Sequence, residues 1–193
     1  MTRRRGSPDA RVVKTHERLA QALVALTLER GYDAVTVREL TARAGVGYAT
    51  FFRHCSSKEA LLEQLLTDTL DDLMARLTPQ LVTSDLARIG TLVFGHARDH
   101  ADRYRVLLRT GEITGLLERC TRLGTETLSA TFIPKPGSVV PFEVAAHHLV
   151  HSFIGLVAWY LDAGLPHTPE RMGEILEALI LEPTYRVALE AKK

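Results

Sequence analysis

The chain has 193 residues, 46% hydrophobic and 24% charged, which is ordinary for a soluble globular protein with one or two domains. No stretch approaches the roughly 18 consecutive apolar residues of a membrane helix, and the basic N-terminus lacks the apolar core of a secretory signal, so we expect neither. The two cysteines, Cys55 and Cys120, have no C-x-x-C spacing. A disulfide framework and a cysteine zinc site are therefore not expected, and a cytoplasmic location is the simplest expectation.

The net charge of +1 conceals an asymmetry along the chain. Residues 1–58 carry 11 Lys/Arg and 5 Asp/Glu, a net charge of +6, whereas residues 59–193 carry 13 and 18, a net charge of −5. Opposite charges on two parts of one chain suggest that the first part meets a polyanion. Chance clustering of solvated charges would give the same counts, so a motif is needed to decide.

Helical periodicity runs through almost every long segment, and no period-2 run is convincing, so we predict an all-α fold. The first helix is predicted over about residues 9–30 and is ended by Gly31. Thr36 and Glu39 form a capping box that opens a short second helix, which stops near Ala44.

The third predicted helix is also short, from about Tyr48 to His54. A long fourth helix opens at Ser57 to Glu59 and is predicted to end at Pro79. Further helices are predicted near residues 84–100, 102–110, 115–131, 142–163 and 169–181.

Residues 36–54 contain two short helices separated by the tight turn Ala44-Gly45-Val46-Gly47, which is the layout of a helix-turn-helix. Gly45 supplies the positive φ that the turn needs, and Val46 can fill the space between the helices. The shared core is predicted to consist of Leu40, Ala44, Val46 and Phe51. The outward face of the third helix then offers Tyr48, Ala49, Thr50, Phe52, Arg53 and His54.

This outward face suits a DNA groove, where the start of a recognition helix presents side chains to base edges. Ala49 is small enough to touch a thymine methyl, and Tyr48 can stack or hydrogen-bond at a base edge. Thr50, His54 and Lys58 can donate to phosphate oxygens. An ordinary helical hairpin with a mixed surface is the alternative interpretation.

The same segments resemble the DNA-binding domain of the tetracycline-repressor (TetR) family over about residues 11–66. The resemblance is carried by Thr36-Val37-Arg38-Glu39-Leu40, Ala44-Gly45-Val46, Ala49-Thr50-Phe51-Phe52-Arg53-His54 and Ser57-Lys58-Glu59-Ala60-Leu61-Leu62. It implies DNA contacts from Thr36, Arg38, Gly47, Tyr48, Ala49, Thr50, Phe52, His54 and Lys58. The chain departs from the family at three positions, where serine, tyrosine and a bulky aromatic are usual: Gly47, Phe52 and Cys55.

The resemblance also implies a homodimer that binds a palindromic operator and responds to a small-molecule effector. We therefore predict a DNA-binding domain over residues 1–56 and a ligand-binding and dimerisation domain over residues 57–193. The apolar helices near 142–163 and 169–181 are expected to form a four-helix interface with a second copy. The alternative is that they complete the core of a monomer.

An effector pocket is expected among the middle helices, because a regulator needs an input. Its candidate lining residues are Phe94, Tyr104, Leu108, Leu116, Leu117, His148, Ser152 and Trp159. Plain core packing of the aromatic residues is the alternative. No organic cofactor is predicted.

Two groups of histidines have the i, i+4 spacing that can share a metal ion, His96 with His100 and His147 with His151, the latter beside His148. Histidines with ordinary hydrogen-bond partners are commoner, so no metal site is predicted and the role of both groups stays open. A basic arm at residues 3–5 could enter the minor groove, although a solvated tail is the commoner case.

No nucleophile elbow, P-loop, dinucleotide fingerprint or H-E-x-x-H occurs, so an enzyme is not expected. The sequence predicts a ligand-responsive repressor that binds DNA and itself and does not bind membranes. The alternative is a helical small-molecule or metal-binding protein with no specific operator. Activation in place of repression is a third possibility that the sequence does not separate from the first.

Overall fold

A computed structural model describes residues 10–81, 86–110 and 115–191 of the chain. It divides into two compact units, Met1–Thr67 and Asp68–Lys193. The boundary lies within one continuous helix, α4 (Lys58–Leu81), and the predicted division after residue 56 falls just before that helix begins. The basic arm at residues 3–5 lies outside the described residues.

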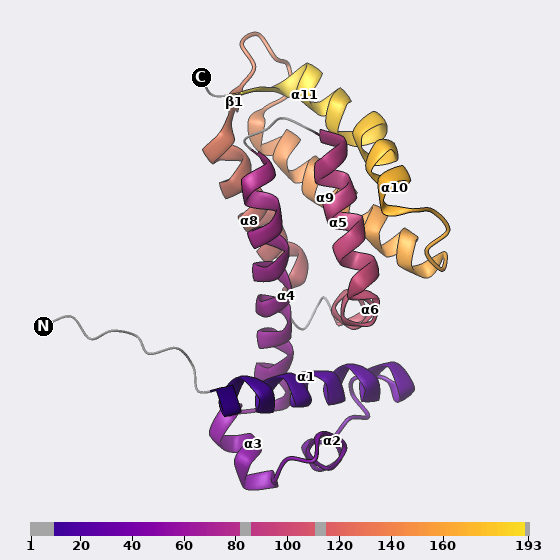
Figure 1. Ribbon diagram of the computed structural model, residues 1–193. Coiled ribbons are helices and arrows are strands. Elements are labelled where there is room, and N and C mark those ends of the chain that lie inside the picture. Colours follow the sequence, from indigo (N-terminus) through magenta and orange to yellow (C-terminus); the bar gives the residue numbers. More distant parts are fainter. Residues whose placement is uncertain (1–9, 82–85, 111–114, 192–193) are drawn as a thin grey trace, which may run out of the picture. The chain divides into compact units, whose positions relative to one another are not determined.

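The first unit contains α1 (Ala10–Arg30), α2 (Val37–Ala44), α3 (Tyr48–His54) and the first turns of α4. Figure 1 shows α1 running across α2 and α3. The C-terminal glycine predicted for α1 is confirmed, because Gly31 has φ 85° and its N–H donates to the carbonyl of Thr27 at 2.9 Å.

Leucines from three helices, together with one aromatic ring, form the core of this unit. The side chains that are at most 1% exposed are Leu19, Leu23, Leu40, Phe51, Leu61, Leu62, Leu65 and Leu66. Each such side chain contributes roughly 1.5–3 kcal/mol by leaving water. The short helices α2 and α3 therefore depend on packing against α1 and α4, since isolated helices of this length are marginal in water.

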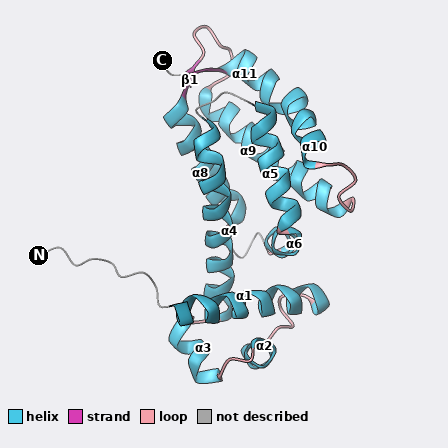
Figure 2. Ribbon diagram, in the orientation of Figure 1, coloured by secondary structure: helices cyan, strands magenta, loops and turns pink. Residues whose placement is uncertain are grey.

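The second unit follows α4 with further helices and a small sheet, whose bounds are α5 (Leu86–Asp99), α6 (Ala101–Arg109), α8 (Leu116–Thr131), β1 (Phe132–Pro134), α9 (Phe142–Asp162), α10 (Pro169–Leu176), η1 (Glu177–Leu181), α11 (Glu182–Ala188) and β2 (Leu189–Ala191). Helices dominate the fold, as Figure 2 shows, and the predicted all-α class is confirmed. The strands β1 and β2 pair antiparallel, with Ile133 opposite Glu190. Three-residue strands are too short to give an alternating pattern, so the sequence did not predict them.

Two predicted helix ends are wrong. Pro79 lies inside the last turn of α4, which continues to Leu81, so the hydrogen bond that proline lacks is lost only near the end of the helix. The last predicted helix does not stop at residue 181, because the chain continues helically to Ala188 through the π-helical turn η1. There the N–H of Glu182 donates to the carbonyl of Glu177, five residues back, and this wider turn comes just before Pro183.

The core of the second unit joins α5, α9 and α10. The ring of Phe94 packs edge-on against Tyr160, with ring centroids 5.3 Å apart, and both side chains are fully buried. Helices α5 and α10 approach closely where Gly90 faces Gly173, because a Cβ at position 90 would lie 2.6 Å from the Cα of Gly173. Larger residues at this crossing would force the two helices apart.

By length and composition alone, α9 could cross a membrane, since an 18-residue window within it has a mean hydropathy of 1.3. A core helix of a soluble protein meets the same criterion. Only 33% of that window is buried within this chain, and the helix carries three histidines, His147, His148 and His151. One such helix is weak evidence for a membrane span.

Candidate nucleic-acid interface

The turn between α2 and α3 is held by backbone geometry that only certain residues supply. Thr36 caps α2 and forms the predicted capping box, in which its side chain accepts from the N–H of Glu39 and the Glu39 carboxylate accepts from the N–H of Thr36. Gly45 has φ 61° and ψ 39°, the left-handed conformation predicted from the sequence. The N–H of Val46 then donates to the carbonyl of Thr41 at 2.9 Å, which closes the turn.

One buried residue determines which face of α3 is exposed. Phe51 is fully buried in the core of the first unit, whereas Tyr48 is 57% and Phe52 is 48% exposed. The rings of Tyr48 and Phe52 pack edge-on, with centroids 5.1 Å apart, and Ala49 is exposed beside them. Helix α3 therefore presents a short face that combines two aromatic rings with one small residue.

Polar groups border this face. Thr50 and His54 are half-buried, and the hydroxyl of Thr50 accepts a hydrogen bond from the exposed guanidinium of Arg53 at 2.7 Å. The hydroxyl proton of Thr50 is therefore directed away from Arg53, because the oxygen acts as the acceptor. This arrangement leaves one donor available to an anion beside α3.

The three departures from the family pattern have visible structural consequences. Gly47 is the N-cap of α3 and makes no side-chain capping hydrogen bond. Phe52 offers an exposed ring without a hydroxyl donor. Cys55 is the C-cap of α3 and is buried, and this burial raises the pKa of its thiol, so the residue acts as a small apolar side chain.

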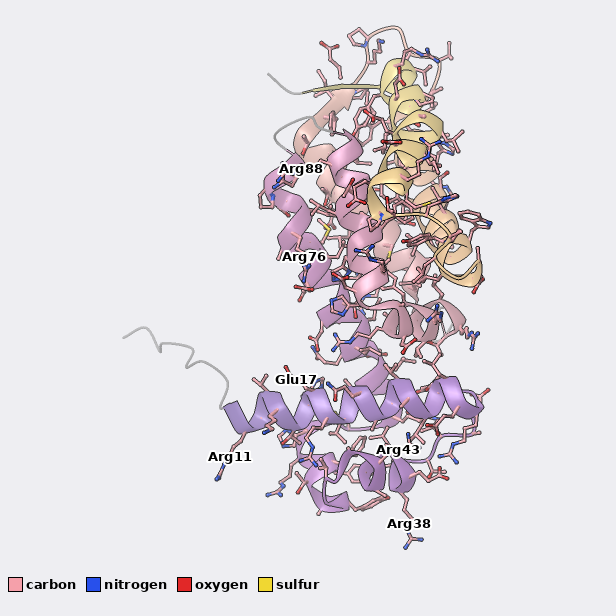
Figure 3. The ribbon with its side chains drawn as sticks, turned by 45° about the vertical axis from the view of Figure 1, so that its right-hand side comes forward. Arg11, Glu17, Arg38, Arg43, Arg76 and Arg88 are labelled. Carbon is pink, nitrogen blue, oxygen red and sulfur yellow. The ribbon has the colours of Figure 1, made fainter. Side chains whose placement is uncertain are left out.

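A hollow of about 610 Å³ lies between the start of α2 and the start of α3. It is lined by Thr36, Val37, Arg38, Thr41 and Tyr48. Figure 3 shows Arg38 projecting away from α1. Arg38 and Tyr48, predicted from separate helices, thus border one concave surface.

Two other arginines near α2 form ion pairs within the first unit. Arg43 donates two hydrogen bonds to Glu29, at 2.7 and 2.9 Å, and this hydrogen bonding lowers the pKa of Glu29. Arg30 pairs with Glu39 at 2.8 Å. Arg38 takes part in none of the ion pairs found among the described residues, so its charge is directed to solvent.

The ammonium of Lys58, predicted to contact phosphate, forms hydrogen bonds within the first unit. It donates to the carbonyls of Tyr32 and Val35, both at 2.9 Å, and lies 4.0 Å from the centroid of the Tyr32 ring. Two of its three N–H donors are thereby occupied. Lys58 ties the loop before α2 to the start of α4, a role that the sequence did not indicate.

These features define an all-helical protein with a helix-turn-helix domain at its N-terminus. The sequence of residues 19–65 matches the family described as bacterial regulatory proteins, tetR family. This match bears out the resemblance noted from the sequence over the helix-turn-helix and the helices that pack against it.

Comparisons over longer segments agree. The chain is 24% identical over 188 residues to YxbF of Bacillus subtilis, named an HTH-type transcriptional regulator, covering 94% of this chain and 48% of that protein. It is 37% identical over 71 residues to the HTH-type transcriptional repressor KstR2 of Rhodococcus jostii, covering 36% of this chain and 34% of that protein. The matched segments thus span about half or less of the length of these relatives.

The fold matches a solved TetR-family transcriptional regulator from Syntrophomonas wolfei with a TM-score of 0.73. The match covers 89% of this chain and 95% of that one, at 15% sequence identity. At this identity the likeness concerns the fold, and it extends to the helices of the second unit.

The structure does not bring the eight predicted effector-pocket residues together. Phe94 is core, and the hydroxyl of Tyr104 hydrogen-bonds to His96 at 2.9 Å. His148, Ser152 and Trp159 lie on α9, where the first and last are exposed. The remaining three residues border an open hollow of about 950 Å³, the outer hollow; they are Leu108, Leu116 and Leu117.

A second cavity, the inner cavity, has a volume of about 200 Å³ and lies within the second unit. The sequence did not predict it. Its lining is almost entirely apolar and comes mainly from α4, α8 and α9. Typical members are Leu73, Ile89, Cys120, Thr127 and Phe153. Burial raises the pKa of the Cys120 thiol to about 11, so the one titratable group among these five is neutral.

Replacing Lys58 tests whether its ammonium is structural. Lys58→Met should lower the free energy of unfolding by about 1.5–3 kcal/mol, because hydrogen bonds from a charged donor are lost and two carbonyls are left without a partner. Urea unfolding followed by circular dichroism measures this change. Lys14→Met, an exposed substitution on α1, is the control and should change stability by less than about 0.5 kcal/mol. Unchanged stability of Lys58→Met would contradict the structural role and return the residue to phosphate binding.

Proposed function

We propose that this chain is a transcriptional regulator that binds operator DNA by placing α3 in the major groove. The observation that carries the proposal is the exposed face of α3, which Phe51 and the Gly45 turn fix within a tetR-family domain. A recognition helix in a helix-turn-helix lies in the major groove with its N-terminal residues at the base edges. The net charge of +6 on residues 1–58 supports a polyanionic partner.

The proposed contacts divide by chemistry. Tyr48 and Ala49, at the start of α3, are placed to read base edges, with Arg38 beside them across the hollow. Thr50 and His54 carry donors suited to phosphate oxygens. We propose that the four other predicted residues support the interface through their backbone or through packing. They are Thr36, Gly47, Phe52 and Lys58.

We propose repression as the regulatory outcome and the cytoplasm as the location. The support is by likeness, since KstR2 of Rhodococcus jostii is named a repressor and the matched family consists of bacterial regulatory proteins. A bound regulator that covers a promoter blocks the polymerase, whereas one that binds upstream can activate. The position of the operator relative to the promoter decides between these outcomes.

Selection from random double-stranded oligonucleotides tests the DNA contacts. The native chain should enrich a palindromic site, and Tyr48→Ala should change the preferred bases in each half-site, because a base-edge contact is lost. Thr50→Ala should preserve the sequence but weaken binding to every DNA about fivefold, a loss of ~1 kcal/mol for one phosphate hydrogen bond. Fluorescence anisotropy measures both effects, and identical behaviour of the two variants across sequences would contradict this division.

A second copy of the chain is the proposed partner of α9. The spacing of Val144, His148, Gly155 and Trp159 places all four on one face of that helix, and all four are exposed. The added Cβ of an alanine at Gly155 would meet no atom within 4 Å, so another helix can approach there. Leu179 on η1 is 67% exposed and extends the apolar surface. A dimer would present two copies of α3 to successive turns of a palindrome.

Leu179→Arg should convert the dimer into a monomer, because a charge at a packed apolar interface is left without a partner. Sedimentation velocity measures the change, and circular dichroism should show unaltered helix content. Val139→Arg is the matched control, since Val139 is 95% exposed on the loop before α9. A monomeric native protein, or a Leu179→Arg dimer, would contradict the proposed interface.

The effector is proposed to be a small apolar molecule that occupies the inner cavity. A cavity of about 200 Å³ with an almost entirely apolar lining resembles the apolar cavities, roughly 150 Å³, that admit benzene. The outer hollow is larger, but Glu118, Arg122, Glu126 and two histidines line it, which suits a polar occupant. A bound molecule in the inner cavity would contact α4 and α8 together.

Benzene at about ten times its Kd should stabilise the protein by ~1.4 kcal/mol, which corresponds to roughly 3–5 °C in Tm for a chain of this size. Cys120→Phe should abolish this shift because the ring fills the inner cavity. Arg122→Phe, on the same helix but in the outer hollow, is the control and should retain it. Loss of the shift in Arg122→Phe alone would assign the site to the outer hollow instead.

A further inference from the structure

Three side chains from two neighbouring segments of the second unit converge without any role in DNA binding. They are Asp72 of α4, His96 of α5, and His100 at the junction of α5 and α6. Nε2 of His96 lies 2.9 Å and Nε2 of His100 lies 3.7 Å from the same oxygen, Oδ2 of Asp72. The potential ligand atoms of the three residues all lie within 4.8 Å of one another.

The size of this triangle suits a transition metal. Zinc binds nitrogen and carboxylate oxygen at about 2.0–2.2 Å in tetrahedral geometry, so its ligand atoms lie roughly 3.4 Å apart. The distances of 2.9 and 3.7 Å lie on either side of that value. Asp72 is exposed, so its carboxylate has room to adjust to the ion.

The imidazole of His96 is also held by a hydrogen bond at its other ring nitrogen. Nδ1 of His96 hydrogen-bonds to the hydroxyl of Tyr104 at 2.9 Å, which fixes the ring with Nε2 toward Asp72. Histidine ligands characteristically use the second ring nitrogen in this way. The side chain of His96 is 1% exposed. A metal at Nε2 requires the tautomer whose proton sits on Nδ1 and is donated to Tyr104, so metal binding replaces the hydrogen bond from Nε2 to Asp72.

The other side of the cluster is open to solvent. The side chain of His100 is 29% exposed and that of Asp72 is 47% exposed, so an ion can enter and a water molecule can complete its coordination. We propose that Asp72, His96 and His100 form a three-ligand site for a divalent transition metal, with zinc as the ion that fits best. Two imidazoles and one carboxylate are a common ligand set for this ion.

Arg76 competes for the same carboxylate. It lies one turn after Asp72 on α4 and donates to Oδ2 at 3.1 Å. Oδ2 of Asp72 thus accepts from both Arg76 and His96. Metal binding must displace Arg76 and overcome its repulsion of the cation. Removal of the Arg76 charge is therefore expected to strengthen binding.

A bound ion would join α4 to α5, since Asp72 belongs to the first helix and His96 to the second. The same two helices supply Leu73 and Ile89 to the inner apolar cavity. The metal would thus hold two walls of that cavity at a constant separation. This link makes the site a candidate second input in addition to the proposed apolar effector.

Calorimetric titration of the full chain, treated with EDTA and dialysed, with zinc chloride tests the site. One equivalent should bind, and Asp72→Asn or His100→Ala should weaken binding at least tenfold, whereas Arg76→Gln should tighten it several-fold. Cobalt(II) in the native chain should show the intense visible bands of tetrahedral coordination, and these should disappear in His100→Ala. Circular dichroism confirms that each variant is folded, which is expected because Asp72 and His100 are both accessible to solvent.

The control is the double variant His147→Ala/His151→Ala, which removes the stacked histidine pair of α9, whose ring centroids are 3.7 Å apart. It should bind zinc as the native chain does. Binding that survives His100→Ala but is lost in the α9 double variant would overturn the proposal. So would the absence of any zinc binding by the native chain.

Discussion

The rotation of α3 about its own axis is fixed by the complete burial of one ring, Phe51. Successive residues of a helix are separated by about 100°, so burying Phe51 in the core of the first unit directs Tyr48, Ala49 and Phe52 to solvent. The angle at which α3 leaves α2 depends in turn on Gly45, whose left-handed backbone a side chain would strain. The proposed reading of DNA depends on these two constraints, because neither exposed aromatic ring is held by a hydrogen bond of its own.

The two units use polar groups in different ways. In the first, arginine and lysine side chains fix the backbone, as the Lys58 ammonium between two carbonyls and the Arg43 pair with Glu29 show. An exposed ion pair such as Arg43–Glu29 adds little stability, so the apolar core supplies most of the stability of the first unit. In the second unit polar groups converge on His96, and a separate apolar cavity is the proposed site of a small molecule. The proposed binding of DNA and the proposed sensing of an effector therefore have different physical bases.

The N-terminal unit could be predicted because its determinants are local. A capping box spans four residues and the Gly45 turn spans four, so the sequence alone specifies both, and both are confirmed. The fate of Lys58 could not be predicted, because its partners, Tyr32 and Val35, lie more than 20 residues away. An ammonium can donate to a phosphate or to a carbonyl, and the tertiary fold decides which acceptor is near.

The second unit was predicted less well for related reasons. An apolar residue at helical spacing can face the core, a cavity or a partner, so Phe94 and Trp159 carry the same signal but lie in the core and on the surface. Asp72 and His96 are 24 positions apart in the sequence, so the periodicity of the sequence does not indicate that they form a hydrogen bond. The π-helical turn before Pro183 likewise follows from how the chain accommodates proline, which periodicity does not report.

In the proposed complex, α3 enters the major groove twice on one DNA molecule. Dimethyl sulfate modifies guanine N7 in the major groove and adenine N3 in the minor groove, so protection from it reports directly on which groove is occupied. On the DNA site that the protein prefers, a dimer with one α3 in each half-site should protect guanine N7 in two patches about 10 base pairs apart, or a multiple of that spacing. Protection confined to adenine N3, or a single unpaired patch, would contradict it.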